Sequence, residues 1–153
     1  MPDLMELAEE IRHLLPYKEP FLFVDELEEV NEDGAKGNFT FQEDMPFYAG
    51  HFPDNPITPG VILIECMAQI GLVSLGIFLS GAYQTKEHIP FAFTSSEVEF
   101  YKQVLPGEKV MVKSEKIYFR LGKLKCKVSM NNEQGETVCK GVLSGMSIRK
   151  RVL

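Results

Sequence analysis

The segment from Val61 to Leu79 constrains the fold more than any other part of the 153-residue chain. It is almost entirely apolar, and Glu65 is its single charged residue. Pro59 suits the first position of a helix and Gly81 suits its end, so we expect one helix over this segment with Thr58 as its N-cap. A helix that is apolar on every side must be enclosed by the rest of the fold.

Two environments are compatible with such a helix. A membrane-spanning helix needs about 20 apolar residues, a length that this segment has. Against a membrane stand Glu65 and Gln69 near one end, the small residues along the segment and the lack of flanking Lys or Arg. We therefore favour a buried core helix. Within it, Glu65 is either held by a neighbouring hydrogen bond or used in catalysis, because an unpaired buried carboxylate is costly.

A histidine precedes the helix in the loop Gly50-His51-Phe52-Pro53. An imidazole titrates near neutral pH, and a carboxyl group on an apolar helix has a perturbed pKa, so His51 and Glu65 are candidates for general acid–base catalysis. Gln69 lies four residues after Glu65 and shares its helix face, where we expect it to orient the acid. Gly60 begins the helix and leaves its N–H open to a ligand, at the end where the helix dipole favours an anion.

The rest of the chain alternates between turn residues and stretches with the composition of strands. A short amphipathic helix is expected before Pro16. Tight turns join the last three stretches, which indicates an antiparallel meander. The predicted fold is α+β, with residues 1–153 forming one domain in which five to six antiparallel strands wrap around the apolar helix. The expected strands cover residues 21–30, 37–41, 91–101, 109–120, 123–131 and 137–148.

Composition limits the functions that such a domain can have. The net charge is −6, yet residues 102–127 contain eight bases against two acids. This stretch is either an ordinary solvated strand face or a docking surface for an acidic protein. Nucleic acid is not an expected partner, because the pI is about 5.1 and no recognition motif is present.

Cysteine and histidine usage indicates the compartment and the cofactors. The three cysteines form no CxxC pair, and the N-terminus has no basic signal-peptide region, so we expect reduced thiols in a cytoplasmic protein. The three histidines are scattered, so no metal site is expected.

From Leu15-Pro16 to Met146 the chain resembles the 3-hydroxyacyl-(acyl-carrier-protein) dehydratases of type II fatty-acid synthesis, which have the hotdog fold. Three motifs with family-specific spacing surround the start of the apolar helix, and three supporting motifs lie elsewhere. The central motifs are Gly50-His51-Phe52-Pro53, Pro59-Gly60-Val61 and Ile64-Glu65 to Gln69. The supporting motifs are Pro20-Phe21-Leu22-Phe23-Val24-Asp25, Val98-Glu99-Phe100-Tyr101-Lys102 and Pro106-Gly107-Glu108.

The resemblance implies a role for each motif residue. His51 is the catalytic histidine and Glu65 the catalytic acid, contributed by opposite subunits of a dimer or of a trimer of dimers. The Gly60 amide binds the thioester carbonyl, and Gln69 supports Glu65. The related dehydratase/isomerase branch tends to have aspartate at the position of Glu65, so the dehydratase-only branch is favoured. The reaction requires no metal or organic cofactor.

The resemblance also predicts a substrate tunnel and a partner. The partner is acyl carrier protein, which is small and acidic. The expected tunnel lining is Ile57, Val61, Ile62, Phe91 and Phe93, and the expected docking bases are Lys102, Arg120 and Lys123. The chain departs from the family at Tyr17-Lys18-Glu19, where the family commonly has His-Arg-Tyr, which puts local dimer or carrier contacts in doubt.

Three functional questions stay open at this point. A hotdog thioesterase and a non-catalytic acyl-thioester-binding module are the alternatives to a dehydratase. Within the dehydratases, the sequence does not separate fatty-acid synthesis from a specialised lipid, polyene or polyketide pathway. The preferred acyl chain length is equally open.

Overall fold

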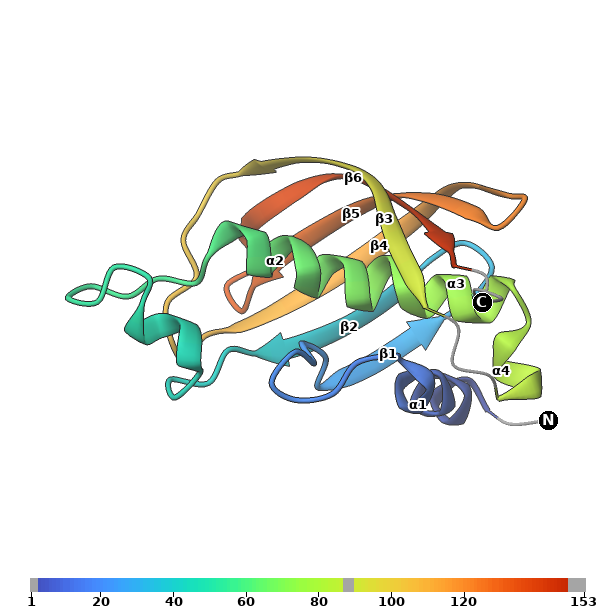
Figure 1. Ribbon diagram of the computed structural model, residues 1–153, viewed down its shortest axis with the longest axis horizontal. Coiled ribbons are helices and arrows are strands. Elements are labelled where there is room, and N and C mark those ends of the chain that lie inside the picture. Colours follow the sequence, from blue (N-terminus) through green and yellow to red (C-terminus); the bar gives the residue numbers. More distant parts are fainter. Residues whose placement is uncertain (1–2, 87–89, 149–153) are drawn as a thin grey trace, which may run out of the picture.

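The computed structural model describes residues 3–86 and 90–148. One six-stranded antiparallel sheet curls around a long helix (Figure 1). The strands are β1 (Glu26–Val30), β2 (Ala35–Thr40), β3 (Phe91–Phe100), β4 (Lys109–Arg120), β5 (Lys123–Asn132) and β6 (Thr137–Ser147). The helices are α1 (Leu4–Leu14), η1 (Pro46–Ala49), α2 (Gly60–Met67), η2 (Ala68–Val73), α3 (Ser74–Leu79) and α4 (Ala82–Thr85).

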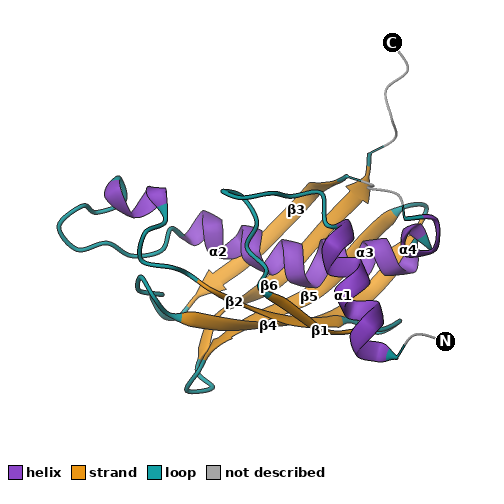
Figure 2. Ribbon diagram, turned by 90° about the horizontal axis from the view of Figure 1, so that it is seen from below, coloured by secondary structure: helices purple, strands orange, loops and turns teal. Residues whose placement is uncertain are grey.

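The strand order in the sheet is β1-β2-β4-β5-β6-β3. Neighbours β4, β5 and β6 form the predicted meander, since each pairs antiparallel with the next along the chain. Buried and partly exposed side chains alternate along β5, because one face of the sheet packs on the central helix (Figure 2) and the other is turned away from it. This curled antiparallel sheet around a core helix is the hotdog fold that the resemblance predicted.

The central helix is continuous from Gly60 to Leu79 through α2, η2 and α3. It is long and apolar enough to cross a membrane. The rest of the domain, however, buries 72% of its most apolar 18-residue stretch. The interpretation as a core helix, which the sequence favoured, is therefore confirmed.

The middle of this helix, η2, is π-helical, with one extra residue in the turn. Ser114 on β4 fixes this turn to the sheet, because its hydroxyl donates to the Gly71 carbonyl at 2.7 Å and accepts the Ala35 N–H at 3.1 Å. A Cβ at Gly71 would lie 3.0 Å from the Cβ of Ser114, so glycine permits this close approach. Gln69 belongs to the same turn and faces the loop that follows α1.

Two local predictions were wrong. Residues 21–25 are a loop, because the Phe23 N–H and the Phe21 carbonyl bond to the side chain of Gln69 and not to a strand. Thr58 does not cap the central helix. Its hydroxyl lies 2.6 Å from the Tyr48 hydroxyl, and Pro59 occupies the N-cap position.

Candidate active site

Glu65 lies on the central helix and borders a cavity of about 150 Å³. The helix, strand β3 and the loop after α1 form its walls. Most of its lining is apolar, as an acyl chain requires. The lining residues are Tyr17, Phe21, Glu65, Ala68, Leu72, Val73, Phe91, Ala92 and Phe93.

Gln69 holds the carboxylate of Glu65 in place. Its side chain is completely buried, and its Nε2 donates to Glu65 Oε2 at 3.0 Å and to the Phe21 carbonyl at 2.9 Å. Its Oε1 accepts the Phe23 N–H at 2.8 Å. These three bonds fix the orientation of the amide, so Glu65 meets a rigid donor one turn along the helix.

The protonation of Glu65 is biased by its surroundings. Burial raises the pKa of the carboxyl group above its ordinary value of 4.5, and the hydrogen bond from Gln69 offsets part of that rise. A carboxyl group with a raised pKa keeps its proton at higher pH than a surface acid does. Glu65 can therefore donate a proton to a substrate in the cavity.

His51 lies in the loop between η1 and α2, and its ring is oriented by the backbone. Its Nδ1 lies 2.9 Å from the Ile57 carbonyl, which can only accept a hydrogen bond, so Nδ1 carries the proton. In the neutral ring this tautomer leaves the lone pair on Nε2 free to act as a base. The Phe52 ring packs edge-on against the imidazole with 4.5 Å between centroids.

Gly60 is the first residue of α2, and no described residue accepts its backbone N–H. The ring of Phe100 covers this position, since a Cβ added at Gly60 would lie 3.1 Å from it. An N–H at a helix N-terminus beside an apolar ring is a suitable donor to a developing oxyanion.

The structure brings together some of the predicted site residues and separates others. Phe91 and Phe93 line the cavity with Glu65, whereas Ile57, Val61 and Ile62 do not. His51 is also outside the cavity lining, and its loop extends past the N-terminal end of α2 (Figure 1). Within one chain, His51 and Glu65 thus belong to separate parts of the molecule.

Sequence reasoning missed six of the lining residues, of which Tyr17 and Phe21 come from the loop after α1. The other four are Ala68, Leu72, Val73 and Ala92. The departure from the family motif at Tyr17 was the available signal. It did not reveal the position of the loop, because the loop is placed by the bonds of Gln69 to Phe21 and Phe23, more than 40 residues away in the sequence.

The three predicted docking bases do not form one patch in a single chain. Lys102 follows the end of β3 that lies near Gly60, and it forms an ion pair with Glu136 at 2.6 Å. Arg120 and Lys123 face each other across the β4–β5 turn at the opposite end of the sheet. There the Arg120 guanidinium lies 4.7 Å from the centre of the Tyr118 ring.

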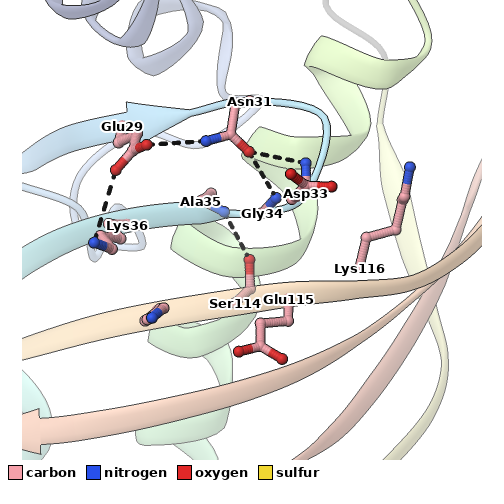
Figure 3. Close-up of a pocket in the computed structure, with 10 residues that line it drawn as sticks. Glu29, Asn31, Asp33, Gly34, Ala35, Lys36, Ser114, Glu115 and Lys116 are labelled. Carbon is pink, nitrogen blue, oxygen red and sulfur yellow. Dashed lines mark hydrogen bonds and ion pairs between the residues drawn. The ribbon is translucent and has the colours of Figure 1, made fainter.

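A larger hollow of about 450 Å³ lies on the surface between the β1–β2 turn and β4 (Figure 3). Its polar groups bond mainly to one another. Asn31 donates to Glu29 and accepts from two backbone amides, and Ser114 accepts from Ala35. Acids and lysines are mixed in its lining, so the hollow does not favour a ligand of either charge and is a poor candidate for the active site. In residues 3–86 and 90–148, no three His, Cys, Asp or Glu side chains form a group that could hold a metal ion.

Comparison with known proteins identifies the family. A family model described as the FabA-like domain matches residues 15–145. The chain is 38% identical over 138 residues to the 3-hydroxyacyl-(acyl-carrier-protein) dehydratase FabZ of Caldicellulosiruptor saccharolyticus, a match that covers 87% of this chain and 92% of that protein. It is 39% identical over 140 residues to the FabZ of Caldicellulosiruptor bescii, with coverages of 88% and 94%.

Solved structures at lower identity share the fold. The dehydratase heterocomplex ApeI:P from Xenorhabdus doucetiae aligns with a TM-score of 0.76 at 15% identity, over 92% of this chain and 91% of that one. Cj0977, a sigma28-regulated virulence protein from Campylobacter jejuni, aligns with a TM-score of 0.65 at 13% identity, over 95% and 92%. The curled sheet around an enclosed helix defines a hotdog-fold domain. The sequence matches define the family, and the chain belongs to the FabA-like family.

Gln69 is expected to be essential for stability as well as for the position of Glu65. Replacing Gln69 with leucine leaves the buried Phe23 N–H and the Phe21 carbonyl without partners, at a cost of about 1–3 kcal/mol for each group. Urea denaturation should show this loss, whereas Gln134→Leu in the exposed β5–β6 turn should change stability little. A Gln69→Leu protein as stable as the original would contradict the bonding described here.

Proposed function

We propose that the protein removes water from 3-hydroxyacyl groups carried by acyl carrier protein and forms trans-2-enoyl thioesters in fatty-acid synthesis. The observation that carries the proposal is Glu65, an acid with a raised pKa in an apolar cavity, in a chain of the FabA-like family. The three cysteines of the chain are free and buried, as expected in a reducing compartment. We therefore place the reaction in the cytoplasm.

Dehydration needs a base for the Cα proton and an acid for the leaving hydroxyl. In this proposal, Nε2 of His51 takes the Cα proton because Nδ1 is already bonded to Ile57. The protonated carboxyl group of Glu65 gives its proton to the 3-hydroxyl, which leaves as water. The Gly60 N–H binds the thioester carbonyl oxygen, on which negative charge develops as the Cα proton departs.

The proposed site needs two copies of the chain, because His51 does not border the cavity of its own Glu65. Strand β3 is ten residues long and, among residues 3–86 and 90–148, pairs only with β6. Its other edge could therefore pair with a second β3 about a two-fold axis. Large apolar side chains are exposed on β3, just after it, at the start of α2 and in the His51 loop, and a second copy could cover them. They are Phe52, Val61, Phe93, Phe100 and Tyr101.

The protein is therefore expected to be a dimer or a trimer of dimers. Light scattering should give a mass of at least twice the 17.3 kDa of the chain. Activity should fall on dilution once the dimer dissociates, since a separated copy lacks a complete site. A fully active species with the mass of one chain would exclude a shared site.

Carrier docking by Lys102, Arg120 and Lys123 is also part of the proposal. Antiparallel pairing of two β3 edges would set the Lys102 end of one copy at the same end of the assembly as Arg120 and Lys123 of the other copy, which lie on the inner strands β4 and β5. Bases that are distant in one chain could then form one surface for an acidic carrier. Electrostatic steering over about 8–10 Å would suffice at physiological salt.

Charge reversal tests this surface. Lys123→Glu and Arg120→Glu are expected to raise the KM for a carrier-linked substrate much more than the KM for a short thioester. The difference should shrink as the salt concentration rises. Equal effects on both substrates, or none on either, would mean that these bases are only a solvated strand face.

Product analysis separates dehydration from the alternatives. Incubation with a 3-hydroxyacyl carrier substrate should yield the enoyl thioester. A thioesterase would instead release the free acid, and an acyl-binding module would give no turnover. A solved hypothetical thioesterase from Streptococcus pneumoniae shares the fold at 14% identity with a TM-score of 0.56, so the fold alone does not exclude hydrolysis.

A further inference from the structure

The cavity of Glu65 contains a second polar side chain, that of Tyr17. The other seven residues that line it in the described part of the chain are alanine, leucine, valine or phenylalanine. Tyr17 lies in the loop after α1, whereas Glu65 lies on the central helix. The two polar groups thus reach one apolar space from different elements of the fold.

The loop that carries Tyr17 is fixed to the helix next to Glu65. Gln69, which donates to Glu65, also bonds the Phe21 carbonyl and the Phe23 N–H. Inside the loop, the Phe21 N–H donates to the Lys18 carbonyl at 2.7 Å, and the rings of Tyr17 and Phe21 pack with 6.4 Å between centroids. One buried amide therefore holds the acid and anchors the loop that carries the tyrosine.

The hydroxyl of Tyr17 is available to a ligand. No hydrogen bond joins it to another described residue. Every fully buried side-chain oxygen in this part of the chain has a hydrogen-bond partner, so the unbonded Tyr17 hydroxyl must border accessible space. Burial, together with the nearby charge of Glu65, raises the pKa of Tyr17 well above its ordinary value of 10. The phenol consequently stays neutral and acts as a hydrogen-bond donor at all working pH values.

We propose that Tyr17 contacts the substrate and donates a hydrogen bond to the 3-hydroxyl oxygen, the same oxygen that receives the proton of Glu65. This inference rests on the proposed dehydration. The Cα proton goes to His51, the bond between C3 and oxygen breaks, and the oxygen leaves as water after taking the proton of Glu65. Tyr17 keeps its own proton throughout and holds the oxygen in line with the acid.

Tyr17 also distinguishes this chain from the family motif that it resembles, in which histidine commonly stands at this position. Both residue types can donate a hydrogen bond from a partly apolar body, so the substitution keeps a donor at the cavity. The phenol extends further than the imidazole and cannot become positively charged. This chain therefore recognises the hydroxyl with a group that does not compete with His51 for protons.

Tyr17→Phe removes the hydroxyl and keeps the ring. Two short thioesters of equal chain length serve as probes, the 3-hydroxyacyl substrate and a saturated acyl analogue without the hydroxyl, which acts as a competitive inhibitor. The variant should lower kcat/KM for the hydroxyacyl substrate by about 3- to 10-fold, the effect of one hydrogen bond, and leave inhibition by the saturated analogue unchanged. Tyr17→His should recover part of the loss because it restores a donor.

Phe21→Leu is the matched control, since it disturbs the packing of the same loop without removing a polar group. It should affect the substrate and the saturated analogue alike. If Tyr17→Phe weakens both ligands equally, or weakens neither, Tyr17 is only part of the wall and the proposal fails. Absence of enoyl product from the unmodified protein would instead refute the dehydration itself.

Discussion

Replacing His51 with alanine is expected to lower the rate of dehydration by about 10²- to 10⁴-fold, the usual contribution of a general base. His51 lies in a loop and makes one hydrogen bond through its ring, to the Ile57 carbonyl, so its loss should cost only about 0.5–1.5 kcal/mol of stability. Steady-state kinetics and thermal denaturation of the same preparation would separate the two effects.

His13→Ala provides the matched control for this experiment. His13 lies on the exposed face of α1, where its side chain is 67% exposed and contacts Glu9. Its removal should leave the turnover number unchanged. Turnover by the His51→Ala protein at the original rate would remove His51 from the mechanism.

Glu65→Gln is expected to reduce dehydration by a similar factor, about 10²- to 10⁴-fold, because the amide keeps the shape of the side chain but cannot give up a proton. Kinetics with the short 3-hydroxyacyl thioester would measure the loss without any effect of carrier docking. Glu133→Gln in the exposed β5–β6 turn is the control and should be fully active. Normal catalysis by Glu65→Gln would assign the acid role to another group or to water.

The same substitution should stabilise the fold at neutral pH. Burial raises the pKa of Glu65 in the folded chain above 4.5, so the folded state binds more protons than the unfolded state as pH rises past that value. The free energy of unfolding therefore falls as the pH rises from about 4.5 through the pKa that Glu65 has in the folded chain. Glu65→Gln cannot ionise, so it avoids this loss of stability. Urea denaturation should show Glu65→Gln to be the more stable protein at pH 7, with the difference disappearing below pH 4.

The sequence predicted the elements that depend on local pattern. The long apolar segment gave the core helix, and the turns at Gly107, Gly122 and Gly135 separated β3 to β6 at nearly the observed boundaries. It failed where a distant side chain determines the backbone. Residues 21–25 have the composition of a strand, yet the amide of Gln69 holds them as a loop.

The candidate site was predicted unevenly for a similar reason. His51, Gly60, Glu65 and Gln69 could be chosen from the sequence because they lie in motifs around one helix start, and their catalytic roles stay predictions. The cavity wall depends on which elements meet in space. Phe91 and Phe93 reach it from an edge strand, and Tyr17 reaches it from the loop that Gln69 anchors. The cavity does not reach the N-terminal end of the central helix, where Ile57, Val61 and Ile62 lie. Val61 is 73% exposed there.

Complementation between two inactive variants tests the central claim, a dehydratase site shared by two chains. His51→Ala and Glu65→Gln copies with different tags would be produced together, and the mixed dimer would be purified through both tags. One of its two sites then combines an intact His51 with an intact Glu65, so dehydration should return to about half the rate of the unmodified dimer. A mixed dimer as inactive as either variant alone would contradict a shared site.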